Sequence, residues 1–176
     1  MHKVNLHFHT YMIQRIQTVY LALAIAALVT LFFLPLANFI KESPLTDEGS
    51  VPTQQFELRL MGKYLVEGSG DPIVYERYIA EPLLAAILAL LLGFIIIQYK
   101  NRALQITAGR FALIASTAFL VLMATTLSKE LNAEGSINKG YQLGIYIPII
   151  VIVLIFMSLR AIRKDEALVR AADRIR

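Results

Sequence analysis

PLLAAILALLLGFIIIQY, from Pro82 to Tyr99, is the stretch of this sequence that decides its fold class. It runs for 18 residues without a charged side chain. As an α-helix it would be roughly 27 Å long, close to the ~30 Å thickness of the hydrocarbon in a bilayer. A run of this length and apolarity predicts a transmembrane helix.

Three further apolar stretches, Val19–Ile40, Phe111–Leu127 and Leu143–Ile162, have a similar length and character. None has an Asp, Glu, Lys or His in its interior, and Arg160 lies only at the end of the last one. Charged residues make up 17% of the chain, against about 25% in soluble globular proteins. We therefore predict an all-α membrane protein with four transmembrane helices, in one domain covering residues 1–176.

The first two spans are separated by residues 41–81, the longest water-exposed segment of the predicted topology. Within it, Phe56, Leu58 and Leu60 alternate with Glu57, Arg59 and Met61, which is the periodicity of a strand. A tight turn at Gly62-Lys63 into Tyr64-Leu65-Val66 predicts a hairpin, and Ile73-Val74-Tyr75 is a candidate third strand. We expect a small β-prone periplasmic loop between helices one and two.

The distribution of Lys and Arg predicts the orientation in the membrane. Eleven basic residues lie in the N-terminal segment, the loop from Lys100 to Arg110 and the C-terminal tail, and six lie in the other two loops. Because basic residues concentrate in cytoplasmic segments, we expect both termini to be cytoplasmic. Met1 and Met12 both remain possible starts of the chain.

Small residues recur four apart on two of the predicted spans. This spacing lets helices approach closely in a bilayer, where van der Waals contact drives association. The candidate packing residues are Ala85, Ala89 and Gly93 on the second span and Ala108, Ala112 and Ser116 at the third. Hydroxyl groups also cluster at the third span, and they indicate either a polar path or hydrogen bonds within and between helices. They belong to Ser116, Thr117, Thr125, Thr126 and Ser128.

The sequence offers no combination of residues that predicts a cofactor or a metal ion. It contains no cysteine, so thiolate ligands and disulfides are excluded. His2, His7 and His9 have no carboxylate beside them, and we expect an N-terminal extension rather than a metal site. The charged residues Glu76, Arg77 and Glu81 are expected to pair with one another and with water.

The C-terminal tail, residues 163–176, is rich in helix-forming residues and lacks Gly and Pro, so we expect the fourth helix to continue into the cytoplasm. Its basic residues are candidates for contact with lipid or with a protein partner, and a solvated helix end is the alternative. With the last basic residue of the span, they are Arg160, Arg163, Lys164, Arg170, Arg174 and Arg176.

Three short stretches carry a resemblance to a known family. They are Met12–Thr18, then Lys100-Asn101-Arg102 with Leu104 and Gln105, and Lys164–Arg170 followed by Ala172, Asp173, Arg174 and Arg176. Together they resemble a family of small four-helix inner-membrane proteins of Bacteroidota-type bacteria, classed as a domain of unknown function. The resemblance covers Met12 to Arg176 and implies an inner-membrane location without an assigned activity.

These patterns predict a non-enzymatic accessory or scaffold protein that docks with a larger membrane complex. Its expected partners are membrane lipid and other subunits of that complex, and not nucleic acid, because the basic residues flank the apolar runs. A carrier of a small molecule or lipid, using the hydroxyl groups of the third span, is the alternative hypothesis.

Overall fold

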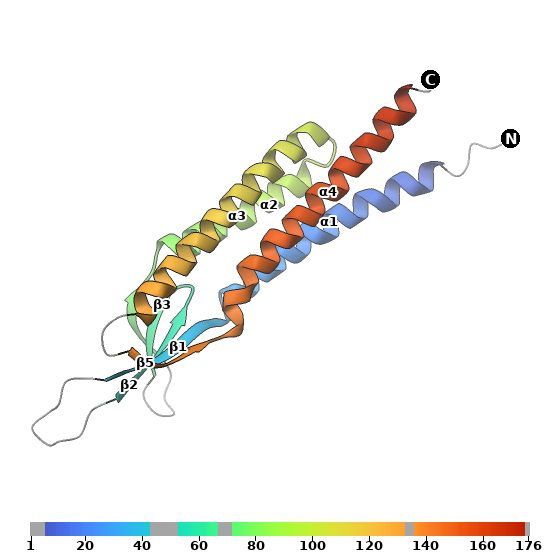
Figure 1. Cartoon of the computed structure of the whole chain (residues 1–176). Helices are drawn as coiled ribbons and strands as arrows, with labels where there is room; N and C mark the ends of the chain where they lie inside the picture. The colour runs from blue at the N-terminus through green and yellow to red at the C-terminus, as the bar shows by residue number, and fades with distance from the viewer. Residues whose placement is uncertain (1–5, 43–52, 67–71, 133–135, 175–176) are drawn as a thin grey trace, which may run out of the picture. The chain divides into compact units, whose positions relative to one another are not determined.

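The computed structural model describes residues 6–42, 53–66, 72–132 and 136–174. These residues form four α-helices and five strands (Figure 1). In order they are α1 (Leu6–Leu31), β1 (Pro35–Glu42), β2 (Thr53–Arg59), β3 (Gly62–Val66), β4 (Ile73–Arg77), α2 (Ala80–Ile97), α3 (Arg102–Leu131), β5 (Ser136–Tyr141), the 3-10 turn η1 (Leu143–Tyr146) and α4 (Ile147–Arg174).

The five strands form one antiparallel sheet in the order β4-β3-β2-β1-β5. The prediction of an all-α protein with four transmembrane helices is therefore wrong, and the fold is a mixture of helices with a five-stranded sheet. The β-prone segment between the first two predicted spans supplies only β2, β3 and β4. The remaining strands come from segments that the sequence assigned to a span and to a short loop.

The interior strand β1 begins within the end of the first predicted span, Val19–Ile40. The helix α1 ends at Leu31, and Pro35 then begins an extended segment. Proline lacks the backbone N–H that a continuing helix requires. Beyond it, β1 pairs with β2 on one side and with β5 on the other, so strand neighbours satisfy its backbone groups.

Three helical segments in the described part of the chain are long and apolar enough to cross a membrane. They are Ala80–Ile97, Arg102–Leu131 and Leu143–Val169, and they contain most or all of the second, third and fourth predicted spans. The apolar part of α1, Ile16–Leu31, is shorter. These three segments are compatible with a membrane protein.

The chain divides into two compact units. One unit comprises Met1–Leu28, Ala86–Thr117 and Ile149–Arg176. It contains most of α1, α2 and α4, and about half of α3. The other comprises Val29–Ala85 and Ala118–Pro148, and contains the sheet with the helical ends that join it.

The sheet packs around aromatic and aliphatic side chains of β1 and β2. Phe39 and Phe56 are cross-strand partners, and their rings stack at 5.4 Å between centroids. Phe56, Leu58 and Leu60 are buried, as their alternation predicts, whereas Met61 is exposed. The predicted hairpin is confirmed, but its turn lies at Leu60-Met61, because Gly62 already pairs with Arg59.

Gly62 at the start of β3 requires the conformational freedom of glycine. Its φ is +155°, and a Cβ at this position would collide with the backbone carbonyl oxygen of Glu76 on β4. The absence of a side chain thus brings β4 close to the hairpin, where Gly62 is the cross-strand partner of Arg77.

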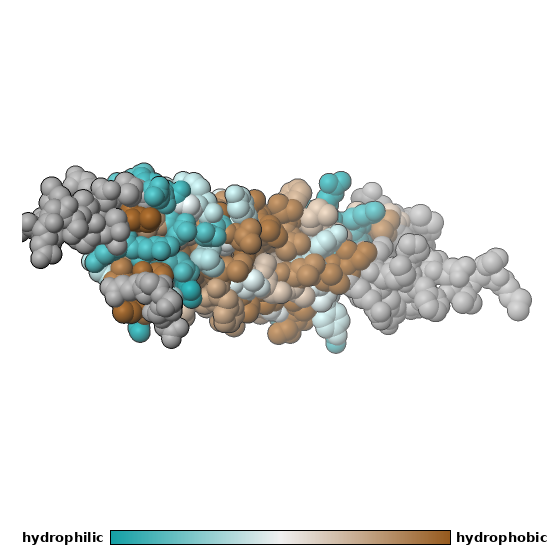
Figure 2. Space-filling view, turned by 90° about the horizontal axis from the view of Figure 1, so that it is seen from below, coloured by the Kyte–Doolittle hydropathy of each residue, from teal (hydrophilic) through white to brown (hydrophobic). Residues whose placement is uncertain are grey.

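The long helices expose apolar side chains, and Figure 2 shows such side chains over much of the helical surface on the face in view. On α2 the exposed residues Leu83, Ile87, Leu90, Phe94 and Ile97 recur at helical spacing, and the buried Leu88, Leu92 and Ile95 form another stripe. A helix that is apolar on both its buried and its exposed faces is suited to a lipid surrounding.

Candidate functional site

The strongest cluster of polar and charged side chains belongs to the unit that contains the sheet. At its centre, Lys63 Nζ on β3 lies 2.8 Å from Oε2 of Glu130 on α3, and both side chains are about nine-tenths buried. The pair joins the last turn of α3 to the middle of the sheet. We refer to Lys63, Glu130 and the three aromatic residues around the ammonium as the lysine clamp.

Three rings surround the ammonium group of Lys63. Its Nζ lies 5.0 Å from the ring centroid of Phe56, 5.2 Å from that of Tyr75 and 5.7 Å from that of Phe39. The three rings come from β2, β4 and β1, so four strands contribute to the clamp. Each ring attracts a desolvated cation by up to roughly 2 kcal/mol, which offsets part of the cost of burying the ammonium.

The position of Glu130 explains why it needs this partner. A carboxylate in the last turn of a helix is repelled by the negative end of the helix dipole. Glu130 lies next to the final residue of α3, Leu131, and is buried. The ammonium of Lys63 offsets this repulsion by pairing with the carboxylate.

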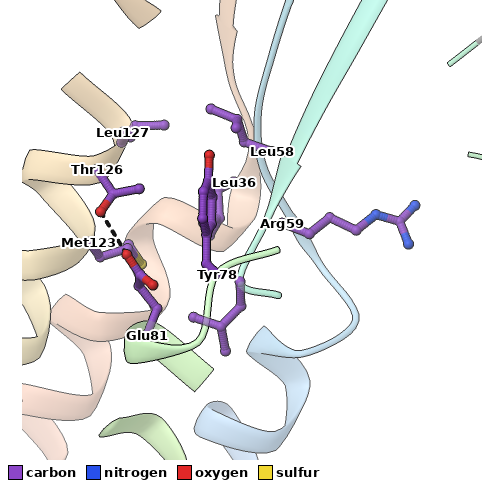
Figure 3. Close-up of a pocket in the computed structure, with 9 residues that line it drawn as sticks. Leu36, Leu58, Arg59, Tyr78, Glu81, Met123, Thr126 and Leu127 are labelled. Atoms are coloured by element: carbon purple, nitrogen blue, oxygen red, sulfur yellow. Dashed lines mark hydrogen bonds between the residues drawn. The ribbon is translucent and has the colours of Figure 1, made fainter. Parts of the chain in front are cut away.

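Beside the clamp, a small cavity of about 10 Å³ lies under the sheet. In Figure 3, Tyr78, Glu81, Met123, Thr126 and Leu127 surround it together with residues of β1 and β2. The Thr126 hydroxyl donates a 2.6 Å hydrogen bond to Oε1 of Glu81, drawn as a dashed line. Glu81 lies in the first turn of α2, where the helix dipole favours a negative charge.

Tyr78 brings a phenol into this polar group beside the carboxylate of Glu130. Its hydroxyl oxygen is buried and has no well-formed hydrogen bond to a described residue. Burial raises the pKa of the Tyr78 phenol above its ordinary value, and the negative charges of Glu130, Glu76 and Glu81 raise it further. The phenol therefore stays neutral, and it is not suited to act as a base or nucleophile near neutral pH.

The side chain of Arg59 extends away from Tyr78 in Figure 3. Its Nε donates to Oε1 of Glu57 at 2.7 Å, and its guanidinium lies 5.3 Å from the centroid of the Tyr64 ring. The cavity itself has room for about one water molecule. The cluster as a whole is organised to hold the sheet and the ends of α2 and α3 together.

A second polar cluster lies in the helical unit. Arg102, the first residue of α3, places Nη2 3.0 Å from Oδ2 of the buried Asp165 on α4. The Asn101 side chain accepts a hydrogen bond from the backbone of Leu104 and caps α3, while the Gln105 amide donates to the Ile95 carbonyl. Nη1 of Arg102 is buried and bonds to no described residue.

The structure describes only some of the basic residues that the sequence proposed as contacts. Arg160, Arg163 and Lys164 are exposed on α4. Arg176 and the side chains of Arg170 and Arg174 lie outside the described residues. Asp165, an acidic residue of the same tail, is buried and pairs with Arg102.

The candidate packing residues differ in their surroundings. Ala85, Ala108, Ala112 and Ser116 are buried, and Ala89 and Gly93 are half-buried. A Cβ added at Gly93 would meet no atom within 4 Å, whereas one at Gly109 would lie 2.5 Å from Cδ2 of Leu159. The spacing of small residues did not indicate Gly109, which adjoins Ala108. The residues four positions before and after Gly109 are Gln105 and Leu113, and neither is small.

Sequence reasoning also missed the lysine clamp. Lys63 and Glu130 are separated by 67 positions, and neither stands in a motif. The one available signal is a lysine directly before the predicted strand Tyr64-Leu65-Val66, and the structure places it opposite the hydrophobic Leu58. Sequence reasoning treated that lysine as part of a turn.

The chain matches a known family over most of its length. A family model described as "Domain of unknown function (DUF4293)" matches residues 13–175. The chain belongs to this family. The match covers nearly the whole chain, including the clamp and the Arg102–Asp165 pair, and the family description assigns no activity. No curated protein matches the chain.

Proposed function

We propose that this protein is a non-enzymatic component of the bacterial inner membrane that docks with a larger membrane complex through its sheet. The observation that carries the proposal is the edge strand β4. It pairs with β3 alone in the described sheet, and all five of its residues, Ile73–Arg77, are exposed.

An edge of this kind is a template for another strand. Its outer side presents backbone N–H and C=O groups that an incoming extended segment can pair with. Exposed apolar side chains add specificity, and β4 carries three in succession, Ile73, Val74 and Tyr75. We infer that the partner contributes an extended segment of its water-exposed part.

The lysine clamp supports this role by holding the edge rigid. Tyr75 on β4 belongs to the clamp, and its ring packs edge-on against Phe56 at 5.3 Å. Since a preformed edge loses less conformational freedom when a strand is added, the clamp favours docking. Its charges are satisfied internally, which supports a structural rather than a catalytic use.

We further propose that the sheet is periplasmic and that the C-terminus is cytoplasmic. The chain passes through α2 and α3 between β1 and β5, and these strands pair. Both strands therefore lie on one side of any bilayer that the two helices cross. The basic loop around Lys100 and the basic tail then belong to the opposite, cytoplasmic side by the distribution of positive charge.

The alternative, a carrier with a polar path along α3, has less support. Ser116 and Thr117 both donate to the Leu113 carbonyl, and Thr125 donates to the Leu122 carbonyl. Thr126 donates to Glu81. These hydroxyls are engaged inside the protein and do not present a continuous row of free donors and acceptors.

Site-specific photocrosslinking in cells tests the docking proposal. A photoreactive residue at Val74 on β4 should form a discrete adduct with one membrane protein, and the same residue at the exposed Val153 on α4 should not. Val74→Lys should release that protein during purification in mild detergent, because an edge lysine opposes strand addition. Val74→Thr should retain it. Retention by Val74→Lys, or no adduct at Val74, would overturn the proposal.

A further inference from the structure

The helical unit contains a groove that the docking proposal does not use. It has a volume of about 150 Å³ and is lined by Leu113 of α3 and by Phe156, Leu159, Arg160 and Arg163 of α4. Three of these residues are apolar and two are cationic. Because Arg160 and Arg163 are three residues apart on one helix, they lie on the same face.

Close contact between two helices forms the floor of the groove. Leu159 is buried, and its Cδ2 would lie only 2.5 Å from a Cβ at Gly109. Leu113 stands one helical turn beyond Gly109 on α3, so it continues the same face. Because Gly109 has no side chain, Leu159 of α4 can pack against α3 at this point. Leu113 and Phe156 are partly exposed and form the apolar walls of the groove.

The two arginines of the groove have no negative partner among the described residues. Both are exposed, and neither forms an ion pair there. The nearest acid in the sequence, Asp165, is paired with Arg102, and Glu166 has an interaction of its own. The positive charge at this end of the groove is therefore not compensated within the described chain.

The two arginines of the groove directly follow a long run of uncharged residues in the sequence. From Leu143 to Leu159 the sequence has 17 residues without a charge, and Arg160 is the first charged residue after them. As a helix, this run is roughly 25 Å long, close to the thickness of the bilayer hydrocarbon. If α4 crosses the membrane, Arg160 and Arg163 stand at the boundary between hydrocarbon and headgroups.

We infer that this groove binds one anionic diacyl phospholipid. Its phosphate accepts hydrogen bonds from the guanidinium groups of Arg160 and Arg163, whose planar fork matches phosphate oxygens. One acyl chain lies along Phe156, Leu159 and Leu113. The two cations select a headgroup of net negative charge over a zwitterionic one, and Lys164 adds a third positive charge nearby.

Native mass spectrometry of the full chain in mild detergent tests this inference. The protein is titrated with phosphatidylglycerol, with phosphatidylcholine and with inorganic phosphate. We expect one phosphatidylglycerol bound in preference to phosphatidylcholine, and no displacement by inorganic phosphate at equal concentration. In the double variant Arg160→Gln/Arg163→Gln, the affinity for phosphatidylglycerol should fall about thirty-fold, because two basic contacts with the anionic headgroup are lost.

Lys129→Gln/Lys139→Gln is the matched control, because it removes two exposed positive charges from the other unit. It should bind phosphatidylglycerol like the wild type. Circular dichroism must show equal helix content in both variants. Equal binding of the two lipids, displacement by inorganic phosphate, or wild-type binding by the Arg160→Gln/Arg163→Gln protein would each overturn the inference.

Discussion

The ammonium of Lys63 on β3 lies 2.8 Å from the carboxylate of Glu130, which is 67 residues further along the chain at the end of α3. The contact joins a strand to a helix whose sequence positions suggest no relationship. The same ammonium group is surrounded by the aromatic rings of Phe39, Phe56 and Tyr75. The stability of the sheet-containing unit should therefore depend strongly on either partner.

Replacing one partner of this pair should destabilise the protein more than replacing both. Glu130→Gln leaves the Lys63 ammonium buried without its counter-charge, and we expect the free energy of unfolding to fall by about 3–5 kcal/mol. Lys63→Met/Glu130→Gln removes the isolated charge and should recover much of this loss. Thermal unfolding in mild detergent, followed by circular dichroism, measures both. Lys129→Gln, at the exposed neighbouring position, is the control and should melt like the wild type.

The Tyr78 hydroxyl should contribute nothing favourable to stability. It is buried beside Glu130 without a well-formed hydrogen bond, so folding removes it from water without fully replacing the hydrogen bonds that it makes there. We expect Tyr78→Phe to leave the free energy of unfolding unchanged or to raise it by about 1–2 kcal/mol. The same unfolding measurement applies. A clear loss of stability would instead mean that the hydroxyl has a partner, such as a water molecule in the adjoining cavity.

The Tyr78 phenol should ionise at a higher pH than a tyrosine of the unfolded chain. Its pKa is raised by burial and by the charges of Glu130, Glu76 and Glu81, whereas an unfolded tyrosine ionises near pH 10. The folded state therefore holds this proton more tightly than the unfolded state does, so the free energy of unfolding should fall as the pH rises above about 10. In an ultraviolet titration of the folded protein, Tyr78→Phe should not reduce the phenolate signal near pH 10. A reduced signal there would show that Tyr78 titrates like an exposed phenol.

Two glycines in the helical unit should respond oppositely to the addition of a methyl group. Gly109→Ala places a Cβ 2.5 Å from Leu159, and overpacking of this kind costs about 1–3 kcal/mol. Gly93→Ala meets no atom within 4 Å, so the better helix propensity of alanine should leave stability equal or higher by up to about 1 kcal/mol. Melting temperatures of the two variants in the same detergent give the comparison. Equal melting of both would contradict the contact at Gly109.

The orientation can be tested with single cysteines, because the natural chain has none. Lys139→Cys on β5 should react with a membrane-impermeant maleimide in spheroplasts, since we place the sheet on the periplasmic side. Lys100→Cys, between α2 and α3, should react only after the membrane is permeabilised. Labelling of both sites before permeabilisation would contradict a crossing by α2 and α3.

The long apolar runs could be identified from the sequence because their signal is local. Three of the four predicted spans coincide with helical segments long and apolar enough to cross a membrane. The alternation around Phe56, Leu58 and Leu60 likewise predicted the β2–β3 hairpin, since burial of every second side chain follows from strand geometry.

Only the tertiary structure decided the sheet and the clamp. Pro35 to Ile40 are apolar enough to continue a span, yet they form part of an interior strand, because β2 and β5 satisfy the backbone on both sides. That pairing depends on Ala37 meeting Tyr141 across more than half of the chain. Lys63 is buried for the same reason: Glu130 and three rings from separate strands must be in place before an ammonium can leave water. Hydrophobicity along the chain determines which segments prefer lipid, whereas pairing partners that are distant in sequence determine which backbone and charged groups are satisfied.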